Sequence, residues 1–394
     1  MEPLEGLSQV PLRWLASRWQ RERAQNLEEW RRSDASLATP HLATLCRAVN
    51  ETAKQLSNDP HALGAQLLAT RVRCDDLHFQ DASEVAAYTV QHLTDRYGRV
   101  TQVLERLFVM GHLPLRLRKL SVLETGAGPA PGLYAVRDFY ADLTLWAETT
   151  EQQTEFTPVT HMHALDRGTA WGRLLHQLSE RLVSLRSELP DSLGALPFRV
   201  EYSDLAGFSP IREHVKALDR TAARISAEFD LADEPITRST ARRFAEQDGV
   251  DRPSVYDLVV MCNFLTTEDS IRNFRTELRQ LASSLTPGGL LIALGHHAYG
   301  KNNKYTRIWS DLRMLMAGTG LTELNGLEKP ITANSNPKWA KMIRRQRQVI
   351  LDELRSVDAL PVELSDLQET DRFPSFQALV WKNQRPPRKK TLHH

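Results

Sequence analysis

The sequence predicts an α/β protein with a mainly parallel sheet, preceded by an all-helical region. Residues from about 10 to 118 carry helical patterns almost throughout. Short apolar runs, typical of buried strands, then alternate with helical stretches as far as about residue 384. This alternation favours parallel strands joined by right-handed crossovers, with helices on both faces of the sheet. The strand candidates are residues 119–124, 159–166, 198–204, 256–264, 288–295 and 376–383.

The amphipathic pattern of the leading region is clearest in AYTVQHLTDRYGRVTQVLERLF, residues 87–108. Apolar side chains recur there at steps of three and four residues, which predicts a helix with one buried face. Further helices are predicted over residues 132–148 and 268–285. The recurring apolar positions of the first helix are Val90, Leu93, Tyr97, Val100, Val103, Leu104 and Leu107.

A glycine-rich turn follows the first predicted strand, in VLETGAGPAPGLYAV, residues 122–136. In an open parallel sheet the ligand lies beyond the carboxyl ends of the strands, and the first strand-to-helix turn forms its floor. Gly126 and Gly128 would let the backbone turn sharply near a ligand, and Gly132 opens the next helix. The spacing GxGxxxG differs from the GxGxxG dinucleotide fingerprint.

Three further residues of the turn indicate what it binds. Pro129 and Pro131 remove two of the N–H donors that a pyrophosphate would need at the start of the helix. Glu124 would place a carboxylate at the mouth of the site, where it would repel phosphate and favour a cation. We therefore expect a ligand that is uncharged or cationic near the turn, with an adenosine-like remainder.

Composition narrows the class of protein. The 394 residues suffice for two domains, with residues 1–118 as the helical one and residues 119–384 as the α/β one. No apolar stretch approaches the roughly 18 residues that span a bilayer, and the N-terminus lacks the order of a secretion signal, so a cytoplasmic protein without membrane contact is expected. Cys46, Cys74 and Cys262 are too far apart for a metal site, and none is predicted.

Two segments do not fit a simple alternation of strands and helices. Residues 210–252 are long, charged and helical in pattern, and are interpreted as an extended crossover or a cap. The basic tail, residues 385–394, is expected to be disordered.

The turn and two later stretches together resemble the class I S-adenosylmethionine-dependent methyltransferases. The first motif of that family has the form acid-x-G-x-G, as in Glu124–Gly128. YDLVVMCNFLT (256–266) is similar to the family's fourth-strand motif, and LTPGGLLIALG (285–295) to its Pro-Gly-Gly turn into the fifth strand. The resemblance implies a Rossmann-like, seven-stranded, mainly parallel sheet, S-adenosylmethionine as cofactor, and methyl transfer as the activity.

The resemblance also implies roles for residues at the strand ends. The family's second-strand acid, which binds the ribose hydroxyls, corresponds to Asp166, and its third-strand acid, which meets the adenine amino group, to Asp204. Each could instead be a helix N-cap. Asn263 could bind cofactor or acceptor. The predicted cofactor-binding residues are Glu124, Gly126, Gly128, Gly132, Asp166, Asp204 and Asn263.

Side chains after the fourth and fifth strands face the transferred methyl group in that family. They correspond to Asn263, Phe264, His296, His297 and Tyr299. Of these, His296, His297 and Tyr299 are the catalytic candidates, because a histidine could take a proton from a hydroxyl or amine. The histidine pair could equally be polar lining, and Cys262 is expected to be an inert core residue.

A narrower resemblance links the chain to the methyltransferase-like proteins of mitochondrial small-ribosomal-subunit assembly. It rests on AAYTVQHLTDRYGRVTQVLERL leading into LETGAGPAPGLYAV, residues 86–107 and 123–136. Ala130 stands where that group has a glycine, its iron–sulfur cysteines are missing, and LIALGHHAYG replaces its Glu-Pro-Gly ending.

Three functions remain open from the sequence. The first is methyl transfer to a small-molecule or peptide acceptor, with the helical region and residues 210–252 forming a lid or a homodimer contact. The second is methylation of RNA or a role in ribosome assembly, for which residues 13–32 and 338–348 supply arginines and tryptophans. The third is a protein that binds S-adenosylmethionine without catalysis. We favour the first, because the net charge is only +1.

Overall fold

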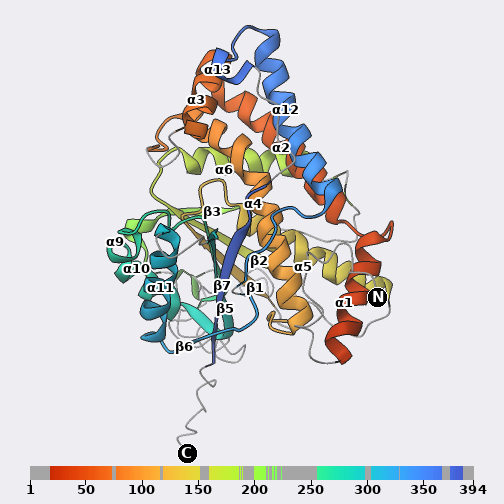
Figure 1. Cartoon of the computed structure of the whole chain (residues 1–394), viewed down its shortest axis with the longest axis vertical. Coiled ribbons are helices and arrows are strands. Elements are labelled where there is room, and N and C mark those ends of the chain that lie inside the picture. The colour runs from red at the N-terminus through yellow and green to blue at the C-terminus, as the bar shows by residue number, and fades with distance from the viewer. Residues whose placement is uncertain are drawn as a thin grey trace, which may run out of the picture.

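A seven-stranded sheet forms the centre of the protein (Figure 1). The computed structural model describes residues 18–72, 77–115, 119–150, 159–185, 199–209, 255–297, 303–327, 329–365 and 373–384, with a few isolated positions between 187 and 223. The order of the strands is β3-β2-β1-β4-β5-β7-β6. The strands are β1 (Leu120–Thr125), β2 (Val159–Asp166), β3 (Glu201–Asp204), β4 (Tyr256–Cys262), β5 (Leu285–His296), β6 (Leu321–Glu323) and β7 (Phe376–Asn383).

The strand directions confirm the predicted mainly parallel sheet. Strands β1 to β5 pair in parallel with one another, whereas β7 is antiparallel to both β5 and β6. The chain moves outward from β1 to β2 and β3, and then returns to the other side of β1 with β4. A topological switch point therefore lies between β1 and β4, where open α/β sheets bind their ligands.

Helices cover both faces of this sheet. They are α1 (Arg18–Arg32), α2 (Ala38–Ser57), α3 (Pro60–Val72), α4 (Ala82–Met110), α5 (Pro131–Thr149), α6 (Trp171–Ser184), the 3₁₀ turn η5 (Leu205–Gly207), α9 (Ser270–Asn273), α10 (Arg275–Ser283), α11 (Lys304–Ala317), α12 (Pro337–Ser356) and α13 (Val362–Ser365). Alternate strand residues enter different cores. Val122 of β1 packs in the core shared with α4 and α5, and Leu123 packs in the core shared with α10 and α11. Burial on both faces explains why the strands are apolar runs.

Helix α4 is the longest helix of the described chain, at 29 residues. It begins at an N-cap, Asp81, whose carboxylate accepts the backbone N–H groups of Ser83 and Glu84. It ends at Gly111, which adopts a left-handed conformation with φ 75°. The apolar face predicted from the sequence is buried in the core against α5.

The helical layer contains segments from both ends of the chain. Helix α12 packs against α2, α3 and α4, and Figure 1 shows α12 running beside α2. These helices and one face of the sheet share a single hydrophobic core. The division into residues 1–118 and 119–384 stays a prediction. Residues 210–252 and the tail 385–394 fall almost wholly or wholly outside the described residues.

Some boundaries differ from those predicted. The predicted helix 268–285 is two short helices, because Phe274 leaves the helical conformation between α9 and α10. Strand β5 begins at Leu285, ahead of the Pro-Gly-Gly turn, and β3 is shorter than its candidate. Strand β6 matches none of the candidates because its three residues are too few for a period.

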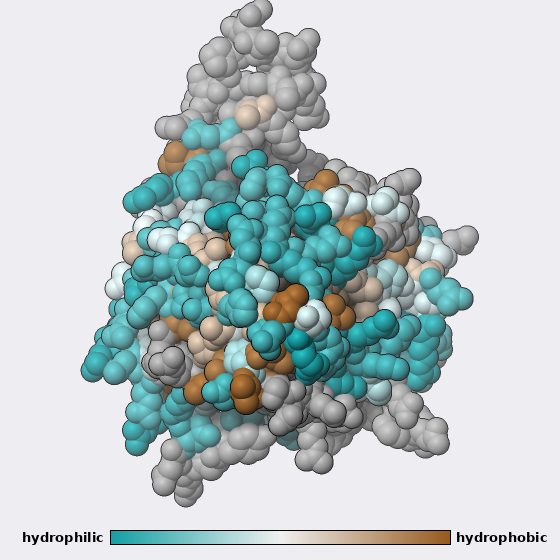
Figure 2. Space-filling view, turned by 90° about the horizontal axis from the view of Figure 1, so that it is seen from above, coloured by the Kyte–Doolittle hydropathy of each residue, from teal (hydrophilic) through white to brown (hydrophobic). Residues whose placement is uncertain are grey.

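Few large hydrophobic side chains are exposed on the described surface. Figure 2 shows a mainly hydrophilic face with small, separate hydrophobic areas. The exposed large hydrophobic side chains are distributed over or beside α3, α6, α11, α12 and α13: Val72, Val183, Met314, Val349, Val357 and Val362. None of the described helices combines the length and apolarity needed to cross a bilayer.

Candidate functional site

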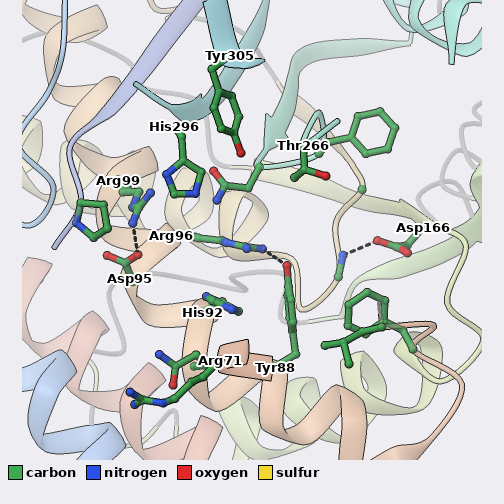
Figure 3. Close-up of a pocket in the computed structure, with 18 of the residues that line it drawn as sticks. Arg71, Tyr88, His92, Asp95, Arg96, Arg99, Asp166, Thr266, His296 and Tyr305 are labelled. Carbon is green, nitrogen blue, oxygen red and sulfur yellow. Dashed lines mark hydrogen bonds and ion pairs between the residues drawn. The ribbon is translucent and has the colours of Figure 1, made fainter. Parts of the chain in front are cut away.

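A cavity of about 840 Å³ opens beyond the carboxyl ends of the central strands (Figure 3). It lies at the switch point, and residues from the first strand-to-helix turn, from the ends of β2, β4 and β5, and from helices α3, α4 and α12 line it. Of the predicted site residues, the following line it: Gly126, Gly128, Asp166, Asn263, His296 and His297. The complete lining extends in sequence from Arg71 to Pro374, so the structure brings together side chains that more than half of the chain separates.

The glycine turn is held tightly against its neighbours. Gly126 has φ 59°, and a Cβ atom added to it would lie 2.2 Å from the Phe264 ring. The N–H of Ala127 donates to the carbonyl of Leu165 at 3.1 Å, and the N–H of Gly128 donates to Asp166 Oδ2 at 2.8 Å. Only a residue without a side chain allows Phe264 to approach the turn this closely. The turn is therefore a rigid floor for the cavity.

Helix α5 begins directly after the turn, and its first residues explain an irregularity of the motif. Ala130, which stands where the narrower family has glycine, adopts the left-handed conformation at φ 57° and ψ 47°. That region favours glycine, so Ala130 is held there against its own preference. Pro131 follows as the first helical residue, a position that suits its fixed φ and missing N–H.

Glu124 differs from its expected position. Its side chain is fully buried below the turn and does not line the cavity, so the expectation of a charged carboxylate at the mouth is wrong. Burial raises the pKa of Glu124 to about 8, against the opposing effect of backbone hydrogen bonds from Leu133 and Gly132. The carboxyl group is therefore largely protonated at neutral pH.

The buried Glu124 nevertheless leads to the same conclusion about phosphate. Its Oε2 accepts the N–H of Leu133 at 3.1 Å, and Gly132 also donates to this carboxyl group. Because Pro131 has no N–H, the donors of the first turn of α5 are absent or already used. The start of this helix offers no cradle for a pyrophosphate. Gly132 is needed here, since a Cβ atom would lie 2.7 Å from Val260.

Asp166 ends β2 and faces the cavity from the side opposite Arg99 (Figure 3). Its carboxylate accepts backbone N–H groups from Gly128, Arg167 and Gly168, at 2.8, 2.7 and 3.1 Å. Burial raises its pKa, and these three hydrogen bonds oppose the shift. The Tyr202 hydroxyl donates to the carbonyls of Asp166 and Gly168 and holds the loop in place.

Asp204 lies differently from Asp166. It is exposed, and its carboxylate caps η5 by accepting the N–H of Ala206 at 2.8 Å. The residues lining the cavity include its neighbour Leu205 but not Asp204. The N-cap interpretation therefore describes the observed contact of Asp204, and its role toward adenine stays a prediction.

The ends of β4 and β5 supply the remaining predicted residues. Asn263 adopts φ 55°, and its Oδ1 atom is buried without a hydrogen-bond partner. Burial lowers the pKa of His296, and Arg99 and Arg96 lower it further, so the imidazole is neutral at neutral pH. Burial also lowers the pKa of His297. Tyr299 lies outside the described residues.

Cys262 is an inert core residue, as predicted. It is buried in β4, and burial raises the pKa of its thiol to about 12. The described part of the chain gathers no group of three His, Cys, Asp or Glu side chains able to hold a metal ion.

Sequence reasoning missed the polar face of α4. Figure 3 shows Tyr88, His92, Asp95, Arg96 and Arg99 directed toward the cavity. Arg96 Nη1 donates to the Tyr88 hydroxyl at 2.6 Å, and Arg99 Nη2 pairs with Asp95 Oδ2 at 2.6 Å. These residues recur at three- and four-residue steps on a face of the helix that lies beside the apolar face. The same periodicity, applied to polar residues, could have revealed them.

The charge of the cavity lining is predominantly positive. Its described cations are Arg71, Arg96, Arg99, Arg167, Lys304 and Arg347, against the two carboxylates Asp95 and Asp166. The three lining histidines all have lowered pKa values and add no charge at neutral pH. The chain as a whole carries only +1, so this concentration of cations is local.

Aromatic rings form the apolar walls. Phe79 lies 4.9 Å from both Tyr88 and Trp171, measured between ring centroids, and Phe264 lies 4.7 Å from Phe274. Flat rings at the edge of a cavity suit a planar heterocycle such as adenine.

Comparison with known proteins finds distant similarity to solved structures. No protein-family model and no curated protein matches this chain. The YcgJ protein of Bacillus subtilis is similar at 12% identity, with 74% of this chain and 99% of that chain covered and a TM-score of 0.31. A putative sarcosine dimethylglycine methyltransferase from Galdieria sulphuraria is similar at 12% identity, with 77% and 89% covered and a TM-score of 0.32.

A third similar structure is an S-adenosylmethionine-dependent methyltransferase from Thiobacillus denitrificans in complex with S-adenosylhomocysteine. It is 13% identical, with 72% of this chain and 96% of that chain covered and a TM-score of 0.29. At such identities and TM-scores, the function of this chain must be argued from its own residues.

Proposed function

We propose that the protein is an enzyme that transfers a methyl group from S-adenosylmethionine to a small-molecule or peptide acceptor. The observation that carries the proposal is the glycine turn at the cavity floor, followed by a helix whose first N–H donors are absent or satisfied by Glu124. A site of this form suits a nucleoside cofactor that has no phosphate. S-adenosylmethionine is such a cofactor, with an amino-acid part, a sulfonium and an adenosine.

The residues around the turn fit the polar parts of that molecule. Asn263 Oδ1 is a buried acceptor without a partner, which suits a donor such as the cofactor's ammonium group. Asp166 accepts three N–H groups and retains acceptor capacity for a ribose hydroxyl. The rings of Phe79 and Trp171 suit the adenine. Gly126 and Gly128 would pass beneath the amino-acid part.

Methyl transfer needs alignment more than chemical groups. A lone pair of the acceptor attacks the methyl carbon in line with the breaking C–S bond, whose electrons stay on sulfur and give S-adenosylhomocysteine. An acceptor hydroxyl or amine must also lose a proton. His296 is neutral and beside the cavity, so it can take that proton, and His297 is a second candidate.

The RNA alternative has less support from the described residues. Trp30 and Trp339, which belong to the two basic stretches, are buried in the core and are not available for stacking on bases. Residues 13–17 lie outside the described chain, and the side chain of Trp19 is likewise not described.

Calorimetric titration with S-adenosylmethionine, S-adenosylhomocysteine and NADH tests the proposal. We expect micromolar binding of the first two ligands and none of NADH. Gly128→Arg places a long side chain at the cavity floor beside Trp171 and should abolish binding. Gly318→Arg is the matched control, because Gly318 is exposed at the end of α11, and it should bind as the wild type does.

Two results would contradict the proposal. A folded wild-type protein that binds neither S-adenosyl compound would refute the cofactor assignment. Binding without transfer of labelled methyl to any component of a cell extract would favour the non-catalytic alternative instead.

A further inference from the structure

We propose that one end of the cavity binds an anionic group, a carboxylate or a phosphate, of a small-molecule methyl acceptor. This end, called the arginine end, consists of Arg71 of α3, His92 and Arg99 of α4, and Arg347 of α12. The role of this end as an acceptor subsite rests on the proposed function. The anion binding itself rests on the geometry of Arg99 and its neighbours.

Arg99 is the residue that carries the inference. Its side chain is only 5% exposed, yet it lines the cavity. Nη2 pairs with Asp95, whereas Nε and Nη1 are buried and have no hydrogen-bond partner. Buried guanidinium donors without acceptors are costly. A carboxylate or phosphate in the cavity would supply the missing oxygen atoms in the paired geometry that arginine favours.

Asp95 does not neutralise the surrounding cations. One of its carboxylate oxygens takes the Arg99 contact, and the Asn334 amide donates to the other. Asp166, the other lining carboxylate of the described chain, is on the opposite side of the cavity (Figure 3). At the arginine end, the three cations Arg71, Arg99 and Arg347 therefore face only one carboxylate, Asp95, among the described lining residues, so this end keeps a positive potential.

His92 shows how closely the cations converge. Burial lowers its pKa well below the ordinary value, and Arg96, Arg347, Arg99 and Arg71 each lower it further. Three helices from separate parts of the sequence thus direct positive charge at one imidazole. His92 stays neutral, so its ring can accept a hydrogen bond without adding to the charge.

The arginine end and the proposed cofactor contacts occupy different parts of the cavity. In Figure 3, Asp166 lies on one side, Arg99 and Asp95 on the other, and Arg96 with Tyr88 between them. Ligand cavities of about 300–1,000 Å³ are common, so about 840 Å³ is at the upper part of that range and accommodates an acceptor beside a cofactor.

Burial of Arg99 favours a small molecule over RNA. A backbone phosphate of a folded RNA would have to enter the cavity to reach its guanidinium group. An isolated carboxylate or phosphate on a small acceptor meets no such restriction.

Inorganic phosphate and malonate are suitable probes for this subsite. Binding of each is measured by calorimetry at constant ionic strength, and S-adenosylhomocysteine is titrated into the same protein samples. We expect saturable binding of at least one probe by the wild type. Arg99→Gln should weaken it by at least about tenfold, and Arg71→Gln by a smaller factor, because Arg71 is less buried than Arg99. The affinity for S-adenosylhomocysteine should change by less than about twofold.

Arg272→Gln is the matched control. Arg272 is exposed on α9, pairs with Asp269 and does not line the cavity. This change therefore removes one positive charge from the exposed surface and should not alter probe binding. If Arg99→Gln does not fold, Arg99→Lys keeps the charge beside Asp95 but loses the fork of donors. It should still weaken probe binding, while Arg71→Gln provides an independent measurement.

The outcomes separate the two proposals. Wild-type protein that binds S-adenosylhomocysteine but neither probe overturns the anion subsite and leaves the proposed function standing. Probe binding without S-adenosylhomocysteine binding supports the anion site and refutes its role beside a cofactor. Equal losses of probe affinity in Arg99→Gln and Arg272→Gln would show nonspecific attraction and overturn the inference.

A short RNA that displaces phosphate with higher affinity would overturn the small-molecule assignment. Binding of phosphate but not malonate identifies the anionic group as a phosphate, and binding of malonate but not phosphate identifies it as a carboxylate.

Discussion

The buried carboxyl group of Glu124 should make the protein less stable as the pH rises. Its pKa is raised from 4.5 to about 8 in the folded protein. Between those values the folded state holds a proton that the unfolded state has released, so the free energy of unfolding falls with increasing pH. The full effect of this shift is about 5 kcal/mol, of which about 3 kcal/mol is lost between pH 5 and pH 8.

Comparison with Glu124→Gln isolates this contribution from other titrating groups. Glutamine keeps the shape and can still accept the Leu133 N–H through its amide oxygen, but it cannot ionise. Urea unfolding followed by tryptophan fluorescence gives the free energy of unfolding of both proteins at several pH values. The difference between wild type and variant should shift by about 3 kcal/mol in favour of the variant from pH 5 to pH 8.

The exposed Glu353, which pairs with Lys54, provides the control. Glu353→Gln makes the same substitution at an exposed position, and its difference from the wild type should stay below about 1 kcal/mol at every pH. A difference between wild type and Glu124→Gln that does not change with pH would refute the assignment of a buried, protonated carboxyl group below the turn.

Two further predictions concern the turn and the helical layer. Gly126→Ala would place a Cβ atom 2.2 Å from Phe264 at φ 59°, so the affinity for S-adenosylhomocysteine should fall at least about tenfold. The control Gly318→Ala should leave that affinity unchanged. Equal affinity in both variants would contradict the tight-turn argument. The Asp142 side chain is 1% exposed, pairs with Arg31 and accepts the N–H of Leu37 at 2.8 Å. Asp142→Asn should therefore lower the free energy of unfolding, measured in urea, by about 3 kcal/mol. The exposed control Asp352→Asn should lower it by less than about 1 kcal/mol. A small effect at Asp142 would show that α1 is held by packing alone.

The sequence alone determined most of the sheet. Strands β2 and β7 span the residues predicted, and β1, β4 and β5 differ from their candidates by a few residues at their ends. A strand that is buried on both faces must be apolar at nearly every position, and this pattern can be recognised from the strand's own residues. The turn at Gly126 and Gly128 was also readable, because a sharp strand-to-helix turn needs glycine whatever surrounds it.

Only the tertiary structure decided the electrostatics of the site. Whether Glu124 is charged depends on its burial, and burial results from the packing of α5 on β1 and β4. The direction of β7 depends on its pairing with β5, which lies far away in sequence. The meeting of Arg71, Arg99 and Arg347 depends on how three helices pack, since no periodicity within one helix reports the position of another. Local sequence patterns record which face of a helix or strand is buried. The ionisation of a buried group and the identity of its contacts depend instead on the neighbouring elements that pack against it.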